Sequence, residues 1–289
     1  MELMVIILVL CSAVLHPLRD LLIKNQSFPE AAYLGVTGSW VIFAALQVVL
    51  SGQSFTLPNE IWHLVVSSVV GLFVYYLCVM LTMKAGDLSV YYPIIRSTPL
   101  AIVLISYLFL QQYYTPLTLV GIGVTLVGAV MIQYRRGGGM LQRPKLIFTA
   151  TLAMAGSAIY NLADSVAMQS VAPAPFLFWV YTVLTLALAT FFSLTRPKNR
   201  SVILQLFGCW RSLSLQVFFA GALSYISYML ILFAFQTGGE VAAVSAMRQA
   251  SIPISVLLGA LVLKEKSGLV RLAWSFLLAG GVVTVMLGG

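Results

Sequence analysis

Ten long apolar runs divide this chain, and they constrain its fold more than any other feature of the sequence. Each run has the length of a membrane-spanning helix, which needs about 20 apolar residues. Gly, Ser and Ala are scattered through the runs, which is typical of closely packed membrane helices and unlike the alternation of barrel strands. The runs cover residues 3–24, 31–51, 61–83, 88–110, 116–134, 146–168, 174–194, 213–236, 241–263 and 268–287. We therefore expect an all-α polytopic membrane protein with ten transmembrane helices.

The composition excludes several other classes of protein. Charged residues make up 8% of the chain and hydrophobic residues 61%, whereas a typical soluble domain has about 25% charged residues. A soluble domain, a disordered chain and a nucleic-acid binder are therefore excluded. The expected partners are the lipid bilayer and a small-molecule substrate, with no nucleic acid. The composition is also compatible with protons as coupling ions and with a homodimer.

The basic residues are distributed unequally between the two sides of the predicted helix array. One side carries nearly all the Lys and Arg of the loops, and the opposite loops and both termini carry none. Because basic loops stay in the cytoplasm, this asymmetry places both termini outside, in a multi-pass protein of the cytoplasmic (inner) membrane. The residues concerned are Lys24, Lys84, Arg135, Arg136, Arg143, Lys145, Arg196, Lys198, Arg200, Arg211, Lys264 and Lys266.

The two halves of the chain resemble each other. Tyr75 and Tyr228 lie 153 residues apart, and so do Gly128 and Gly281. Each half would hold five helices, and an odd number makes the second half enter the membrane from the opposite side. We therefore expect two inverted repeats, at residues 1–134 and 146–289, joined by a basic loop at 135–145.

Two arginines lie where a membrane helix should be apolar. Arg96 and Arg248 are each about seven residues into a predicted helix, and each is followed closely by a proline (Pro99 and Pro253). Charged groups at this depth are costly and usually face an interior cavity. We expect Arg96 and Arg248 to bind an anionic group of the substrate, with Tyr92, one turn before Arg96, donating a hydrogen bond. The alternative is that each arginine pairs with an aspartate and only holds helices together.

Asp164 is the acidic counterpart, and Tyr160 and Asn161 lie one turn before it on the same helix face. A carboxylate buried in a membrane can exchange a proton near neutral pH, so Asp164 could couple transport to protons or bind a substrate amine. A structural pairing with an arginine is the alternative. Tyr160 and Asn161 are expected to contribute to substrate binding.

The first helix adds a polar stripe of His16, Asp20 and Lys24 at spacings of four. His16 and Asp20 are further candidates for carrying protons, whereas an interfacial pair of Asp20 with Lys24 is the alternative. Tyr75 and Tyr228, at equivalent places in the two halves, are candidate substrate contacts, and packing is the alternative for them.

The chain resembles the EamA family of the drug/metabolite transporter superfamily, near the branch of permeases associated with phosphonate utilisation. That branch usually has His-Ala-x-Trp-Asn-x-x-x-Lys in its first helix; here His16 and Lys24 match, and Pro17, Arg19 and Asp20 replace the other three. The family stretch Gly-Asp-Leu-Ser-x-x-Tyr-Pro-x-x-Arg is matched over residues 86–96. The resemblance implies ten helices and alternating access, and it implies termini inside, in conflict with the loop charges.

The sequence is therefore best explained as a secondary transporter of a small polar metabolite, a zwitterion or an anion such as an amino acid or aminophosphonate. Export of cationic or aromatic compounds by proton exchange is the second hypothesis. A lipid-handling membrane protein or a membrane enzyme is a third, of another class. The sequence has no His/Asp metal cluster, no Walker motif and no Ser-His-Asp set with family spacing, so we expect no enzyme activity, no metal and no cofactor.

Overall fold

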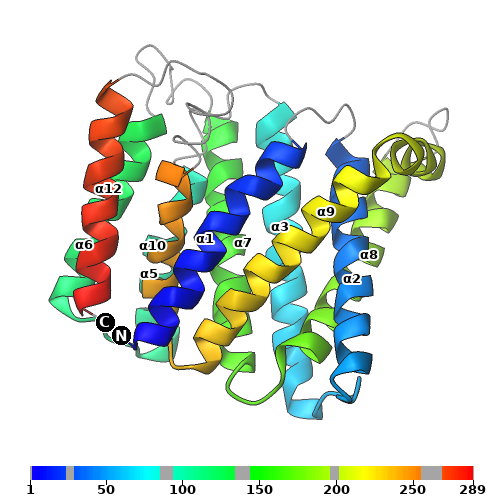
Figure 1. Cartoon of the computed structure of the whole chain (residues 1–289), viewed down its shortest axis with the longest axis horizontal. Helices are drawn as coiled ribbons and strands as arrows, with labels where there is room; N and C mark the ends of the chain where they lie inside the picture. The colour runs from blue at the N-terminus through cyan, green and yellow to red at the C-terminus, as the bar shows by residue number, and fades with distance from the viewer. Residues whose placement is uncertain are drawn as a thin grey trace.

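The fold is a bundle of apolar helices, and no strand occurs in the part of the chain that the structure describes (Figure 1). The computed structural model describes residues 2–23, 29–84, 94–133, 144–195, 202–254 and 269–288. The helices are α1 (Leu3–Ile23), α2 (Pro29–Leu50), α3 (Trp62–Lys84), α5 (Thr98–Leu110), α6 (Pro116–Gln133), α7 (Pro144–Ala167), α8 (Pro173–Thr195), α9 (Val202–Gln236), α10 (Val241–Met247) and α12 (Leu269–Gly288), with 3-10 turns η1 (Asn59–Ile61) and η3 (Arg248–Ala250).

Prolines set the beginnings of four helices, α2, α6, α7 and α8. Proline suits the first helical position because its fixed φ is already helical and its missing N–H would have no partner there. Glycines with a positive φ follow two helix ends, Gly52 (64°) after α2 and Gly238 (89°) after α9. A left-handed residue of this kind satisfies the last carbonyls of a helix and stops it.

Five helices are long and apolar enough to cross a membrane on the criteria of length and composition. Their apolar stretches are Glu30–Leu50, Asn59–Thr82, Pro144–Ala167, Pro173–Thr195 and Leu215–Gln236. Shorter apolar helices cover Leu3–His16, Thr98–Phe109, Pro116–Ile132 and Ala273–Gly288. The prediction of a polytopic, all-helical membrane protein is confirmed.

Two of the predicted helix boundaries need correction. The helix expected at 213–236 begins at Val202, so most of the loop expected at 195–212 is helical. Residues 202–212 are mostly apolar and contain no proline, so nothing in them stops a helix. The helix expected at 241–263 is interrupted after Met247 by the turn η3, and its residues from 255 onward lie outside the described part of the chain.

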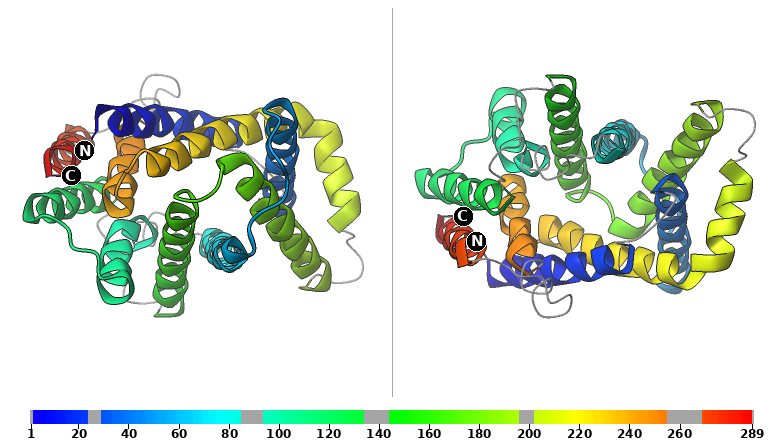
Figure 2. Two further views of the ribbon diagram at one scale, coloured as in Figure 1. Left: turned by 90° about the horizontal axis from the view of Figure 1, so that it is seen from below. Right: turned by 90° about the horizontal axis from the view of Figure 1, so that it is seen from above.

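The helices pack in pairs that join the two halves of the chain. α6 packs along α12, α3 along α7, α1 along α9, and α2 against α8 and α9. In Figure 2, α1 and α9 lie side by side and oblique to the other helices, and both termini lie next to α6 and α12.

Both termini lie at the lower face of the bundle in Figure 1, where α1, α3 and α8 begin and where α7 and α9 end. We call this face the terminal end. Three hydrogen bonds join helices and connections there: Trp179 Nε1 to the Phe55 carbonyl (2.7 Å), Gln169 Nε2 to the Phe235 carbonyl (3.1 Å) and Gln236 Nε2 to the Val171 carbonyl (3.1 Å).

The interface between α6 and α12 depends on glycine. A Cβ atom at Gly281 would overlap the backbone nitrogen of Thr125, and one at Gly128 would lie 2.7 Å from the backbone nitrogen of Leu278. Small residues let membrane helices approach until their backbones touch. We therefore expect Gly281→Ala to force the helices apart and to lower stability by about 1–3 kcal/mol, the usual range for overpacking.

The matched control is Gly280→Ala, because a Cβ at Gly280 has nothing within 4 Å. Its melting temperature in detergent should stay at or above that of the parent, since alanine favours helix more than glycine does. Equal melting temperatures for both variants would contradict close packing at Gly281.

Candidate functional site

Asp164 is the most deeply buried charged residue in the described part of the chain, at 1% exposure. It lies in the last turn of α7, a helix that ends at the terminal end of the bundle (Figure 1). The hydroxyl of Tyr228, on α9, donates a hydrogen bond to its Oδ2 atom. Ser68, on α3, lies beside the carboxylate and is fully buried. Neither Ser68 Oγ nor Asp164 Oδ1 has a hydrogen-bond partner of ordinary geometry among the described residues.

The pairing of Asp164 with an arginine is not found among the described side chains. No described basic group lies within 4.0 Å of its carboxylate. A charged carboxylate without a partner is very costly in an apolar interior. Asp164 is therefore stable in this position when it carries a proton or when a cation from outside the chain lies beside it.

Aromatic rings surround the Asp164–Tyr228 pair. Trp40, on α2, is central: its ring centroid lies 4.1 Å from that of Tyr181, 5.7 Å from that of Tyr225 and 5.6 Å from that of Tyr228. Its indole nitrogen donates to Ser224 Oγ on α9 (2.8 Å). These contacts order the wall of the site, because a buried indole with its N–H satisfied is fixed in position.

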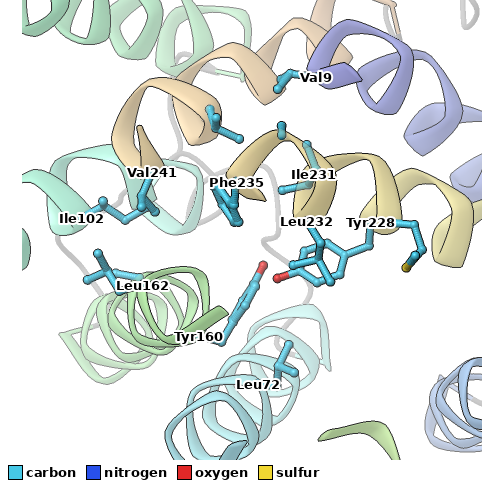
Figure 3. Close-up of a cluster of buried hydrophobic side chains, with 14 of the residues drawn as sticks. Val9, Leu72, Ile102, Tyr160, Leu162, Tyr228, Ile231, Leu232, Phe235 and Val241 are labelled. Carbon is cyan, nitrogen blue, oxygen red and sulfur yellow. The ribbon is translucent and has the colours of Figure 1, made fainter. Parts of the chain in front are cut away.

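Tyr160 completes this wall from α7. Its ring centroid lies 6.2 Å from that of Tyr228 and 6.0 Å from that of Tyr75 on α3. Figure 3 shows the hydroxyl ends of Tyr160 and Tyr228 pointing toward each other between α7 and α9. The structure thus brings together four of the predicted site residues: Tyr75, Tyr160, Asp164 and Tyr228.

Asn161 is buried but bonds within its own helix. Its amide nitrogen donates to the Ser157 carbonyl one turn earlier (2.7 Å). This bond gives the side chain a partner inside α7, so the geometry favours a structural role over the predicted substrate contact.

Arg248 is on the other side of Tyr228. Its guanidinium carbon lies 5.6 Å from the centroid of the Tyr228 ring, a cation–π distance. Arg248 begins the 3-10 turn η3, which interrupts the helix started by α10. Tyr228 therefore touches the acid through its hydroxyl and the base through its ring face.

Arg96 is half-buried near the other helix interruption, at Ser97. Gln249, at 4% exposure, donates from Nε2 to the backbone carbonyl of Arg96 (3.2 Å). The two residues are 153 apart in the chain, the same offset that relates Tyr75 to Tyr228.

Two other predicted site residues cannot be placed. Tyr92 and the side chain of Asp20 lie outside the described residues. His16 is partly buried on α1. Within the described residues, no group of three or more His, Cys, Asp or Glu side chains could hold a metal ion.

Ser68 and Gln249 are the site residues that sequence reasoning missed. Ser68 gave no signal, because a serine in an apolar run is ordinary in membrane helices. Gln249 did give one, since the repeat offset places it opposite Arg96.

Comparisons with known proteins bear on the family and the fold. Residues 1–134 match the model of the EamA-like transporter family. A solved structure described only as the crystal structure of a protein has a TM-score of 0.79 and 16% sequence identity, over 98% of this chain and 97% of that chain. In all, 27 chains of solved structures match. No curated protein matches the sequence. At 16% identity the structural likeness shows the fold alone.

The apolar helices define a multi-pass membrane protein, and its first half resembles a transporter family. The match to the EamA-like transporter family covers residues 1–134, slightly less than half of the chain, and it is the family to which the sequence resemblance pointed. The phosphonate-associated branch stays a prediction.

Proposed function

We propose that this protein is a secondary transporter of a small zwitterionic metabolite, coupled to protons through Asp164. The observation that carries the proposal is the Asp164–Tyr228–Arg248 arrangement: a buried acid without a basic partner among the described residues, and a base on the far side of the same tyrosine. An amino acid or an aminophosphonate has the complementary pair of charges, and Arg grips carboxylates and phosphonates in two places.

Alternating access by two inverted repeats fits the packing of α6 and α12. Gly128 touches Leu278, and Gly281 touches Thr125. The offset of 153 that pairs Gly128 with Gly281 also pairs Thr125 with Leu278. The two contacts are thus equivalent under exchange of the halves, as a two-fold relation between repeats requires.

The pairs α3–α7 and α1–α9 support the same relation. Under exchange of the halves, α1 corresponds to α7 and α3 corresponds to α9, so each pair becomes the other.

A second candidate is the proton-exchanging export of cationic or aromatic compounds. The aromatic wall of Trp40, Tyr181 and Tyr228 beside Asp164 favours it, because aromatic faces attract cations. A net cation would gain nothing from Arg248, however, whereas a zwitterion uses both charges. Competition experiments with an amine, its amino acid and the corresponding carboxylic acid separate the two candidates.

Both termini are proposed to face outside the cytoplasm. Figure 1 places them at one end of the bundle. Exposed Lys145 begins α7 at the opposite end. A C-terminal reporter active only in the cytoplasm should therefore be silent, and the same reporter inserted after Gln133 should be active. The reverse pattern would contradict the proposed orientation.

Ligand discovery is the first experiment on the function. A ligand that binds only the folded protein raises its melting temperature, by an amount that grows with concentration. Purified protein screened against amino acids, aminophosphonates, amines and organic acids should respond to zwitterions. Hits must then show saturable uptake or counterflow in liposomes, since a channel would not saturate in the same range. A response confined to amines would favour the second candidate.

A further inference from the structure

Two glycines let α3 and α7 touch, and this contact places Ser68 and Asp164 on facing sides of the two helices. A Cβ atom at Gly71 would lie 2.7 Å from the Gly156 carbonyl oxygen and 2.7 Å from the backbone nitrogen of Tyr160. Ser68 lies three residues before Gly71, and Asp164 lies four residues after Tyr160. Residues three or four apart share a helix face, so both side chains lie on the faces that touch.

Both side chains keep hydrogen-bonding capacity that the described residues do not use. Tyr228 bonds only the Oδ2 atom of Asp164, and the Oδ1 atom has no partner among the described residues. Ser68 Oγ lies beside the carboxylate, without a hydrogen bond of ordinary geometry in the described part of the chain. Even a serine hydroxyl that donates to a carboxylate retains lone pairs that accept. Buried polar atoms are rarely left unsatisfied, so the pair indicates a polar group from outside the chain.

The hydroxyl of Tyr160 is a third oxygen near this pair. Figure 3 shows it pointing toward the hydroxyl of Tyr228, the group that bonds Asp164. The ring centroids of Tyr160 and Tyr228 are 6.2 Å apart, and that of Trp40 lies 5.6 Å from that of Tyr228. The surroundings of the acid therefore include hydroxyl oxygens and aromatic faces, two kinds of group that attract a small organic cation.

We propose that Asp164 Oδ1, Ser68 Oγ and the hydroxyl of Tyr160 bind the ammonium group of the substrate. A primary ammonium group has three N–H donors, one for each of these oxygens, and its charge compensates that of the carboxylate. Hard metal ions such as Ca²⁺ and Mg²⁺ take about six or more oxygen ligands, which is more than these side chains offer.

This inference rests on the proposed function for the molecule that carries the ammonium group, and it assigns Ser68 as a residue that determines specificity. A bound ammonium keeps the carboxylate of Asp164 charged, whereas a proton neutralises it, so the two exclude each other. The aromatic rings attract any organic cation, including a quaternary one. The oxygens instead require N–H donors, so the site should reject a quaternary ammonium.

Chemical labelling of Asp164 measures occupation of this site without any transport. Dicyclohexylcarbodiimide, an apolar reagent, reacts with a protonated carboxyl group and not with a carboxylate, so a bound ammonium should slow the reaction. In purified protein at fixed pH and ionic strength, methylammonium chloride should protect the Asp164 peptide, measured by mass spectrometry, and the protection should saturate. Tetramethylammonium chloride and sodium chloride should protect at least about tenfold less well, because neither cation has an N–H donor. Asp164→Asn gives the blank.

Ser68→Ala should raise the methylammonium concentration needed for half protection by about tenfold, the effect of one hydrogen bond to a charged group. Ser67→Ala is the matched control, because Ser67 is the preceding residue on α3 and its hydroxyl bonds the His63 carbonyl of its own helix (2.8 Å). It should keep the parental value. Melting curves show that both variants are folded, and the rise of melting temperature with methylammonium gives the same comparison without the label.

Equal protection by the three salts, or parental protection in folded Ser68→Ala, would overturn the inference and leave bound water as the partner of Ser68. The outcome is separate from that of the proposed function, because labelling needs neither transport nor a zwitterion. Selective protection by methylammonium without any zwitterion uptake would contradict the proposed function alone. Saturable, proton-coupled uptake of a zwitterion without selective protection would contradict this inference alone.

Discussion

Asp164→Asn is expected to abolish the pH dependence of transport while substrate binding stays measurable. Asparagine has the same shape and can still accept the hydroxyl proton of Tyr228, but it cannot take up or release a proton. Proton-driven accumulation should fall to the level of empty liposomes, whereas exchange of labelled for unlabelled substrate should continue. Uptake measured across a series of pH values checks both parts.

Ser165→Ala is the control for this variant. Ser165 is the next residue on α7 and is also buried, but its hydroxyl bonds the Leu162 carbonyl of its own helix (2.8 Å). Its transport should keep the parental pH profile. If Asp164→Asn also keeps that profile, Asp164 is a structural residue and the proton pathway must lie elsewhere.

Arg248→Lys is expected to weaken substrate binding by about 10- to 100-fold, with the protein still folded. Lysine keeps the charge, but it loses the planar fork that holds an anionic group at two points and the flat face that lies over Tyr228. The loss corresponds to about 1–3 kcal/mol, the range for a hydrogen bond to a charged group. Arg96→Lys should weaken binding as well.

Both variants need melting curves beside the affinity measurements. Lys145→Gln serves as the control, since it removes a basic residue at the exposed start of α7. Unchanged affinity in Arg248→Lys and in Arg96→Lys would make both arginines helix-locking residues. It would also remove the main reason for preferring a zwitterionic or anionic substrate.

Much of the fold follows from the sequence because membrane-spanning helices have few alternatives. Apolar length sets the spans, and prolines such as Pro116 and Pro144 set where helices begin. The early start of α9 at Val202 was missed, because length alone does not show where a helix extends beyond the apolar layer. The turn η3 was also missed, since the proline nearest to it, Pro253, comes after the turn.

The candidate site was predictable one residue at a time but not as an arrangement. Asp164 and Arg248 could be predicted as site residues, because a charged side chain within an apolar run is costly and usually faces an interior cavity. Whether they pair with each other depends on helix rotation and crossing, which a sequence does not give. Tyr228 between them and Ser68 beside the acid therefore emerge only from the packing of α3, α7 and α9.

Proton movement driven by substrate is the most direct test of proton-coupled transport through Asp164. Parent protein and Asp164→Asn would be reconstituted in liposomes holding a pH-sensitive dye, and a substrate found by thermal shift would be added outside without an imposed pH gradient. The parent should show a substrate-dependent change of internal pH that saturates with substrate, and Asp164→Asn should show none while still exchanging substrate. Net uptake of substrate by the parent with no change of internal pH would contradict the account.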